Sequence, residues 1–377
     1  MKKVSVIFGT RPEAIKLAPV ILRLRREAGF QVNVCVTGQH RDMLDQVLDV
    51  FEVEPDADLN LMRPDQGLAA LTARMIEALD GYLGAVEPDC VLVQGDTTSA
   101  LCGALAAFFR HIPVGHVEAG LRTGDMNAPW PEEANRVLVS RLAHLHFAPT
   151  EANRQNLLAE GVPSEHVAVT GNTVIDALLL AVDKVRRGAV PIDPALREQL
   201  QSLDGRRLVL LTAHRRESFG PGMRSICRGV RALASAHSDT VFIFPVHLNP
   251  HVREVVYPVL GELPNVRLLE PLDYFSFVGL LDAATLILTD SGGLQEEAPT
   301  LGKPVVVMRE KTERSEGVAA GTAVLVGTDE ALIIETVSRL LAEDDAYTAM
   351  ARAVNPYGDG QASDRICRRL SIAGQGT

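Results

Sequence analysis

Acidic side chains follow two apolar runs in the first half of the chain. Asp96 comes shortly after the run Cys90–Gln94, and Glu118 closes the run Val114–Glu118. A third acid, Glu132, stands at the start of a helical segment in "NAPWPEEANR". Carboxylates in different environments can have separated pKa values and can then act as general acid and general base. Helix capping explains only part of the pattern at Asp96 and Glu118. For Glu132 a purely structural role is a strong alternative to catalysis, because acids favour the first turn of any helix.

Cationic and imidazole side chains follow other apolar runs. Arg11 is at the tip of the turn "GTRPEAIK", where a surface charge and a ligand-binding group are equally consistent with the pattern. His214 follows the run Leu208–Thr212 in "TAHRRES" and is adjacent to Arg215. Such a loop suits a phosphate, because arginine offers paired donors. The loop position favours a functional role for His214, and His247 in "FPVHLNP" is balanced between function and core packing.

The segment "LILTDSGGLQEEAP" interrupts a buried run at Ser291–Gly293 and continues with two adjacent glutamates. Glycines let the backbone approach a ligand, and free N–H groups at a helix start suit a diphosphate. Glu296 or Glu297 can then accept hydrogen bonds from the vicinal hydroxyls of a ribose. An ordinary strand-to-helix turn is the simpler alternative. Phe275 in "PLDYFSF" is a candidate to lie along a base, although its residue type favours a helix core.

The elements that must position these residues form a regular alternation. Short runs rich in Val, Ile and Leu alternate with amphipathic segments, which predicts parallel sheets covered by helices on both faces. The expected strands are Val4–Phe8, Val32–Thr37, Cys90–Gln94, Val114–Glu118, Leu145–Ala148, Leu208–Thr212, Val241–Pro245, Val266–Leu269, Leu286–Thr289, Val305–Met308 and Ala323–Val326. Ligands bind beyond the carboxyl ends of such strands, where the candidate residues stand.

The alternation pauses between about residues 172 and 206, in a polar stretch with two prolines. We therefore expect an α/β protein of two doubly wound, Rossmann-like domains with a cleft between them. Residues 1–171 would carry the acids, and residues 172–360 would carry the glycine turn. The final segment "GQASDRICRRLSIAG" predicts a helix at about 361–373 that packs back on the first domain.

The composition narrows the functional class. A chain of 377 residues with 46% hydrophobic and 23% charged residues is typical of a soluble enzyme. A net charge of −11 argues against a nucleic-acid partner. The five cysteines form no C-x-x-C pair, which argues against a zinc or disulfide framework. The sequence contains neither a signal-peptide pattern nor an apolar run of transmembrane length, so we expect no membrane partner and a cytoplasmic protein.

Motifs along almost the whole chain carry a resemblance to one family. They are, in order, "FGTRPEAIKLAPV", "TGQHRDMLDQVL", "QGDTTSA", "HVEAGLRT", "PWPEEANR", "GNTVIDAL", "TAHRRES", "PVHLNP" and "TDSGGLQEEAPTLGKPVVVMREKTERSE". The sequence strongly resembles the non-hydrolysing UDP-N-acetylglucosamine 2-epimerases. The resemblance implies a glycosyltransferase-like GT-B fold with UDP on the C-terminal domain, a homodimer, and no nicotinamide or metal cofactor. It also implies an isomerase that interconverts UDP-N-acetylglucosamine and UDP-N-acetylmannosamine for bacterial polysaccharide synthesis.

The resemblance assigns roles to individual positions. The positions that match the active-site pattern are Arg11, Lys16, Asp96, Glu118, Glu132, Arg136 and His214, and those that match the diphosphate and ribose site are Ser291, Gly292, Gly293 and Glu297. Arg314 falls in a matching segment. Family members can be activated by a second substrate molecule, and the matching positions for it are Gln39, His40, Gln66, Arg215 and His247. Asp42 and Asp65 depart from that pattern, and their charges would weaken binding of a diphosphate effector.

The family reaction eliminates UDP across C1–C2 to give 2-acetamidoglucal and then adds UDP back with the opposite C2 configuration. Which acid serves which face of C2 is left open by the sequence. A UDP-sugar glycosyltransferase would share the fold, but it would not need the three acids. A hydrolysing relative would release free N-acetylmannosamine, and the complete "GTRPEAIK" motif favours the non-hydrolysing branch. A non-enzymatic nucleotide-binding regulator would have no use for the acids.

Overall fold

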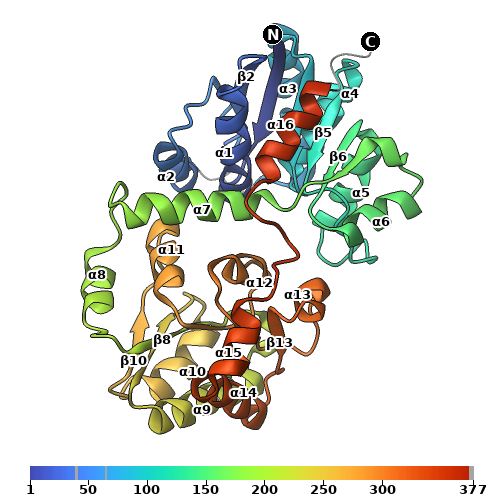
Figure 1. Ribbon diagram of the computed structural model, residues 1–377. Coiled ribbons are helices and arrows are strands. Elements are labelled where there is room, and N and C mark those ends of the chain that lie inside the picture. Colours follow the sequence, from blue (N-terminus) through green and yellow to red (C-terminus); the bar gives the residue numbers. More distant parts are fainter. Residues whose placement is uncertain (39–40, 64–65, 373–377) are drawn as a thin grey trace. The chain divides into compact units, whose positions relative to one another are not determined.

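The computed structural model describes residues 1–38, 41–63 and 66–372 (Figure 1). The chain divides into two compact units. Unit 1 contains Met1–Ala177 and Gly358–Thr377, and unit 2 contains Leu178–Tyr357. The units meet at 177/178 and 357/358, and the boundaries expected from the sequence were 171/172 and 360/361. Within the described residues each unit has one sheet, and every strand pairing in both sheets is parallel.

The sheet of unit 1 has the strand order β3-β2-β1-β4-β5-β6-β7. Its strands are β1 (Lys2–Phe8), β2 (Phe30–Val36), β3 (Ala57–Asp58), β4 (Cys90–Gln94), β5 (Val114–Val117), β6 (Leu145–Ala148) and β7 (Val167–Val169). The chain builds outward from β1 in one direction and then returns to build outward from β4 in the other. The neighbouring strands β1 and β4 therefore form a topological switch point, which is where ligands bind in sheets of this kind.

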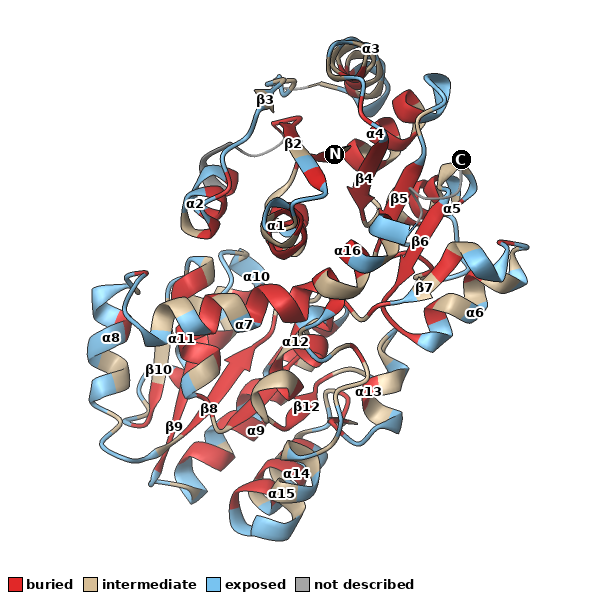
Figure 2. Ribbon diagram, turned by 45° about the horizontal axis from the view of Figure 1, so that its top comes forward, coloured by how far each residue is buried: buried red, intermediate tan, exposed pale blue. Residues whose placement is uncertain are grey.

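The helices of unit 1 cover both faces of this sheet, and their buried faces are red in Figure 2. They are α1 (Arg11–Arg25), α2 (Arg41–Phe51), α3 (Leu68–Val86), α4 (Thr98–Phe109), α5 (Glu132–Leu142), α6 (Glu151–Ala159), the start of α7 (Thr173–Arg186) and α16 (Ala362–Ile372), with a short 3₁₀ turn η1 (Ser164–His166). Ile7, Val91 and Met75 are fully buried in the core between strands and helices.

The last helix of the chain, α16, belongs to unit 1. Arg23 of α1 donates to Asp364 of α16 at 2.5 Å. The buried carboxylate of Asp176 accepts hydrogen bonds from the backbone N–H groups of Ala362 at 3.2 Å and Ser363 at 2.8 Å. These bonds satisfy N–H groups that the first turn of a helix leaves without partners.

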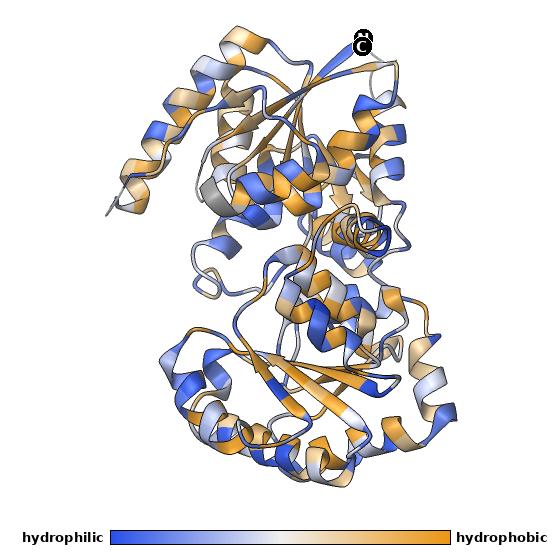
Figure 3. Ribbon diagram, turned by 90° about the vertical axis from the view of Figure 1, so that its left-hand side faces the viewer, coloured by the Kyte–Doolittle hydropathy of each residue, from blue (hydrophilic) through white to orange (hydrophobic). Residues whose placement is uncertain are grey.

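Unit 2 repeats the pattern with the strand order β10-β9-β8-β11-β12-β13. Its strands are β8 (Arg207–Thr212), β9 (Thr240–Pro245), β10 (Val266–Leu269), β11 (Leu286–Thr289), β12 (Val305–Val307) and β13 (Ala323–Leu325). The switch point here lies between β8 and β11. Figure 3 shows the strands of the sheet as mostly hydrophobic, as expected for a parallel sheet covered on both faces.

The helical elements of unit 2 begin with the remainder of α7. The others are α8 (Pro194–Gln201), α9 (Pro221–Ala236), α10 (Pro250–Leu260), α11 (Tyr274–Ala283), α12 (Gly292–Glu297), α13 (Ser315–Ala319), α14 (Glu330–Ala342) and α15 (Asp344–Ala351), with 3₁₀ turns η2 (Arg216–Ser218) and η3 (Ala298–Leu301). Along residues 1–38, 41–63 and 66–372, none of the helices combines the length and the apolar character needed to cross a membrane.

The structure confirms the α/β class and all of the predicted strands, whose ends shift by at most two residues. Two strands were not predicted, β3 and β7. With two and three residues they are too short to give a periodic signal. The polar stretch at 172–206, in which the connection between the domains was expected, contains the helices α7 and α8.

The turn after β1 leaves no room for a side chain at Gly9. A Cβ atom there would lie 2.2 Å from Oγ1 of Thr37 and 2.3 Å from Oγ of Ser99. These two hydroxyl groups are hydrogen-bonded to each other at 2.8 Å. Because Thr37 follows β2 and Ser99 is in the first turn of α4, Gly9 allows the ends of neighbouring elements to meet at the switch point.

Gly9→Ala is therefore expected to lower the unfolding free energy by about 1–3 kcal/mol, because the added methyl group must displace two hydrogen-bonded hydroxyls. Gly81→Ala is the matched control. Gly81 lies inside α3, where an added Cβ atom would meet no neighbouring group within 4 Å, and alanine there should stabilise by about 0.5–1 kcal/mol. Denaturant unfolding of both variants measures the difference. Equal stability of Gly9→Ala and the unchanged protein would contradict the steric argument.

Candidate active site

Arg11 and Asp96 follow the two strands of the switch point in unit 1. β1 pairs with β4 in the register Val6↔Leu92, so the loops that leave the two strands are neighbours. Arg11 begins α1 directly after the Gly9 turn, and it makes no hydrogen bond or ion pair with another described residue. Its guanidinium group is therefore available to an anion.

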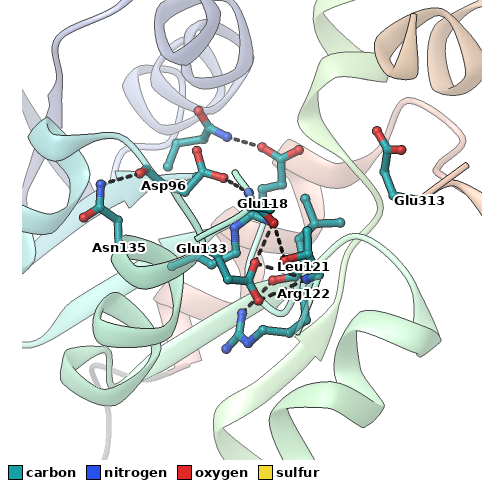
Figure 4. A network of polar contacts seen from close by, with 12 residues as sticks. Asp96, Glu118, Leu121, Arg122, Glu133, Asn135 and Glu313 are labelled. Carbon is teal, nitrogen blue, oxygen red and sulfur yellow. Dashed lines mark hydrogen bonds and ion pairs between the residues drawn. The ribbon is translucent and has the colours of Figure 1, made fainter. Parts of the chain in front are cut away.

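Several side chains donate hydrogen bonds to Glu118, which is labelled in Figure 4. Nζ of Lys16 donates to both carboxylate oxygens, at 2.8 and 2.6 Å. Nδ2 of Asn172 donates at 3.2 Å, and the side-chain amide of Gln94 also donates. The side chain of Glu118 is only 8% exposed, and its φ of 63° lies in the left-handed region. Such a backbone costs about 1–3 kcal/mol and is concentrated at functional sites.

Asp96 lies beside Arg136, which donates to its carboxylate. The side chain of Asn135 fixes the backbone at the same residue by donating to the Asp96 carbonyl at 2.8 Å (Figure 4). Burial raises the pKa of Asp96, and the positive charge of Arg136 opposes this while the negative charge of Glu118 adds to it. A carboxyl group with a raised pKa releases and takes up a proton more readily near neutral pH than an ordinary aspartate.

The adjacent acids Glu132 and Glu133 have different environments. Glu133 is 1% exposed and accepts hydrogen bonds from the backbone N–H groups of Thr123 and Gly124 at 3.0 Å. It is also 3.3 Å from Arg136. Glu133 therefore anchors the loop before α5. Glu132 is half-buried and makes no hydrogen bond or ion pair with another described residue, which leaves its carboxylate available for chemistry.

In unit 2, a pocket of about 290 Å³ lies at the carboxyl ends of β8, β9, β10 and β11. Its lining residues are Thr212, Ala213, His214, Pro245, His247, Pro271, Leu272, Phe277, Ser291, Gly293, Leu294 and Glu297. The predicted His214, Ser291, Gly293 and Glu297 are thus brought together at the switch point of this unit. Apolar walls with a few polar groups are typical of small-molecule sites.

His214 is fixed by a buried acid. The backbone N–H groups of His214 and Arg215 both donate to Oδ2 of Asp290 at 2.8 Å, and Asp290 is fully buried. Nδ1 of His214 lies 3.5 Å from the other oxygen of Asp290. The imidazole ring stacks on His247, with ring centroids 5.6 Å apart. Burial lowers the pKa of His214, and the charge of Asp290 partly opposes this.

The two adjacent glutamates after the glycine turn are also separated by their contacts. Glu296 is 5% exposed and accepts from Nε of Arg314 at 2.8 Å, whereas Glu297 lines the pocket. Gly292 allows the side chain of Glu313 to lie close to the turn, because a Cβ atom at position 292 would be only 3.0 Å from Oε1 of Glu313. α12 has only six residues, so the backbone of the turn is a more substantial source of donors than a helix dipole.

Phe275 lies in α11 and is 5% exposed. Its ring meets Tyr274 edge-on, with centroids 4.9 Å apart. This burial favours the helix-core interpretation. Phe277 lines the pocket instead. No pattern in the sequence distinguishes the two phenylalanines, because both stand in the same short helix.

Other supporting residues were missed by the sequence reasoning. Gln94 and Asn172 donate hydrogen bonds to Glu118. The sequence signal for Gln94 is a polar residue at the end of a buried strand, and that for Asn172 is the motif "GNTVIDAL". His116 is fully buried, and its Nε2 lies 2.8 Å from the carbonyl oxygen of Gly95. Burial lowers the pKa of His116 to about 4, so the ring is neutral and donates to that carbonyl.

The expected effector residues are only partly described. Gln39, His40 and Asp65 lie outside the described residues, and so does the side chain of Asp42. Gln66 accepts a hydrogen bond from Arg74 in unit 1. In unit 2, His247 lines the pocket, and the backbone N–H of Arg215 donates to Asp290. Among the residues that the structure describes, no group of three or more His, Cys, Asp or Glu side chains suits a metal ion.

Comparison with known proteins identifies the family. Residues 22–371 match the family model for UDP-N-acetylglucosamine 2-epimerase. The chain belongs to the UDP-N-acetylglucosamine 2-epimerase family. It is 54% identical over 373 residues to the UDP-N-acetylglucosamine 2-epimerase of Escherichia coli K12, and the match covers 98% of each chain. The family predicted from the collinear motifs is therefore confirmed.

Solved structures agree in fold. The epimerase from Neisseria meningitidis, bound to UDP-GlcNAc, is 48% identical with a TM-score of 0.85, and the match covers 99% of this chain and 100% of that one. Anabaena HepE, in complex with UDP and glucose, is 17% identical with a TM-score of 0.63 over 98% and 99% of the two chains. The second likeness shows the fold alone, and the predicted GT-B-like class is confirmed.

The environment of Asp96 yields a titration test. Arg136→Gln should raise the pKa of Asp96 further, because it removes the positive charge that opposes the effect of burial. Arg136→Lys keeps the charge and should shift the pKa less. The pKa is read from ¹³C carboxyl NMR of aspartate-labelled protein. Arg154→Gln, which removes a surface partner of Glu151, is the control and should leave Asp96 unchanged. An identical Asp96 midpoint in Arg136→Gln and the unchanged protein would contradict the electrostatic role of Arg136.

Proposed function

We propose that the protein interconverts UDP-N-acetylglucosamine and UDP-N-acetylmannosamine by eliminating UDP and adding it back to the opposite face of C2. It is an isomerase of the non-hydrolysing UDP-N-acetylglucosamine 2-epimerase type, consistent with 54% identity over 98% of the chain to a bacterial enzyme of that name. The observation that carries the proposed path is the acid cluster of unit 1. The three acids of this cluster, Asp96, Glu118 and Glu132, have different environments. They are therefore suited to different roles in proton transfer and electrostatic support.

Elimination is the physically reasonable route. The C2 hydrogen of the sugar is scarcely acidic, so its removal must accompany departure of the leaving group. The C1–O bond breaks and its electron pair leaves with UDP, while a carboxylate takes the C2 proton and a C1–C2 double bond forms. The return reaction protonates C2 from the other face and re-forms the C1–O bond. The chemistry needs two proton-transfer groups and support for positive charge developing at C1.

The environments suggest a division of roles. Asp96 has a raised pKa, and Glu132 makes no hydrogen bond or ion pair with another described residue, so both are suited to proton transfer at C2. Glu118 already accepts hydrogen bonds from Lys16, Asn172 and Gln94. A carboxylate bound by three donors is better suited to electrostatic support than to proton transfer.

Unit 2 supplies the nucleotide site in this proposal. The backbone N–H groups of Ser291–Gly293 and the imidazole of His214 bind the diphosphate, and Glu297 accepts from the ribose hydroxyls. Phe277 on the pocket wall offers an apolar surface to the base. Arg11 and Lys16 of unit 1 contribute positive charge, and Arg314 is held by Glu296. The partners are therefore UDP and the two UDP-sugars.

The proposal also covers the location of the enzyme, its oligomeric state and its regulation. The substrate is an intracellular nucleotide sugar, so we place the protein in the cytoplasm. A homodimer is also proposed, as family resemblance implies. Phe108 and Phe109 at the end of α4 are 53% and 59% exposed, and such apolar side chains support an interface on this part of unit 1. Activation by a second substrate molecule, involving Gln66, Arg215 and His247, likewise remains a proposal.

The reaction is tested by incubating the protein with UDP-N-acetylglucosamine in deuterated water. Deuterium should appear at C2 of both epimers, because the acids exchange their protons with solvent while the glucal is bound. NMR resolves the two C2 positions and any free sugar. Epimerisation that retains the original C2 hydrogen would rule out exchange with solvent. Accumulation of free N-acetylmannosamine would reassign the protein to the hydrolysing branch, and transfer of the sugar to an acceptor would reassign it to the glycosyltransferases.

Substitutions separate chemistry from binding. Asp96→Asn and Glu132→Gln should each lower kcat about 100-fold or more with a smaller effect on UDP affinity. His214→Ala should weaken UDP binding as well as turnover. Glu151→Gln is a matched control for Glu132, since Glu151 is likewise the first residue of a helix, and it should keep full activity. Calorimetric UDP binding and initial rates provide the two readouts. Near-normal turnover of Glu132→Gln would restore its structural interpretation.

A further inference from the structure

Glu13 is an almost completely buried acid that the proposed reaction does not use. It is 1% exposed, so its carboxylate is out of reach of a substrate. Oε2 accepts hydrogen bonds from the backbone N–H groups of Gly9 at 3.1 Å and Thr10 at 2.8 Å. Oε1 accepts from the hydroxyl group of Thr97 at 2.6 Å. One carboxylate thus binds two segments that are far apart in the sequence.

Each of those segments adjoins a residue of the candidate active site. Gly9 and Thr10 immediately precede Arg11, and Thr97 immediately follows Asp96. Thr97 also caps α4 by accepting from the N–H group of Ala100 at 3.0 Å. Glu13 therefore fastens the first turn of α1 to the N-cap of α4, directly across the switch point between β1 and β4.

A local cap would not require this arrangement. The capping box of α1 needs only the bonds between Thr10 and Glu13, whereas the bond to Thr97 spans 84 positions of the chain. The main charge effects on the pKa of Asp96 come from Arg136, Glu118 and Lys16. Glu13 is linked to the turn of Asp96 by its hydrogen bond to Thr97, so we look for its influence in the backbone geometry of the two turns.

We propose that Glu13 is a positioning residue for the epimerisation, which sets the placement of Asp96 relative to Arg11 by tying together the turns that carry them. The inference rests on the proposed function, because it assigns to Asp96 a proton transfer at C2. A shift of about 1 Å in a reacting group is enough to cost about 100-fold in rate, and loss of the Glu13 carboxylate would free both turns by such an amount.

Unit 1 contains a matched control for this arrangement. Asp176 is 4% exposed, and it also accepts two backbone N–H bonds and one hydroxyl bond, from Ala362 and Ser363. It fastens α16 and makes no hydrogen bond with Arg11 or Asp96. Burial raises the pKa of Glu13 and of Asp176 alike. Removing either carboxylate should lower stability, but only the loss of Glu13 should alter the chemical step.

The experiment compares Glu13→Ala, Glu13→Asp and Glu13→Gln with Asp176→Ala. Each variant is assayed for melting temperature, kcat, KM and the primary isotope effect with C2-deuterated UDP-N-acetylglucosamine. Glu13→Ala should lower kcat about 30- to 100-fold with little change in KM, and its isotope effect should exceed that of the unchanged protein because C2–H cleavage becomes more fully rate-limiting. Glu13→Gln keeps an oxygen for the backbone and an amide for Thr97, and it should stay within about threefold of full activity.

Glu13→Asp has a carboxylate that is one methylene too short to reach both turns, so it should reproduce the loss in kcat even if Glu13→Ala fails to fold. Asp176→Ala should lower the melting temperature without changing the isotope effect. The inference is overturned if Glu13→Asp has normal kcat per folded molecule, or if its kcat falls while the isotope effect stays at the original value. If the unchanged protein itself does not epimerise the substrate, the failure belongs to the proposed function.

Discussion

The parallel pairing of β1 with β4 is the constraint on which the site of unit 1 depends. The register Val4↔Cys90 to Val6↔Leu92 brings the carboxyl ends of the two strands to one edge of the sheet. The chain leaves β1 through the Gly9 turn and leaves β4 through the Gly95 turn, so Arg11 and Asp96 stand on neighbouring loops. Because the sheet order reverses here, no crossover helix fills the space above these two ends. The candidate residues Arg11 and Asp96 both adjoin that opening.

Five partly or fully buried carboxylates of unit 1 can be compared by the groups from which they accept hydrogen bonds. Glu133, Asp176 and Glu13 accept hydrogen bonds mainly from backbone N–H groups, and they fix loops and helix ends. Asp96 and Glu118 are instead bonded by side chains of Arg136 and Lys16. A carboxylate bound to backbone donors loses those bonds if it moves, whereas one bound to flexible cationic side chains can exchange partners when a substrate arrives. The first class suits structure and the second suits chemistry.

The sequence predicted the strands well because they depend on local patterns, and the candidate acids Asp96 and Glu118 were chosen from the ends of those strands. A run of buried apolar residues defines a parallel strand, and a polar residue at its end is visible without any structure. The partners of those acids depend on contacts between distant positions. Gln94 and Asn172 meet Glu118 across separations of 24 and 54 positions, which no local pattern encodes. Neighbouring residues of the same type were equally hard to separate, as with Glu132 and Glu133, because the direction of each side chain depends on how the preceding loop folds.

The same device occurs at the switch point of unit 2, although the residues differ. Asp290 directly follows β11, and its carboxylate accepts the backbone N–H groups of His214 and Arg215 in the loop after β8. In unit 1, Glu13 follows β1 and binds Thr97 in the loop after β4. In unit 2, Asp290 follows β11 and binds the loop after β8, so the acid comes from the later strand. Both acids are buried, which makes each charge costly to hold and each hydrogen bond strong. Two loops that leave neighbouring parallel strands have no ladder bonds to hold them together. A buried carboxylate between them supplies such a link in both units, from the segment after β1 in unit 1 and from the loop after β11 in unit 2.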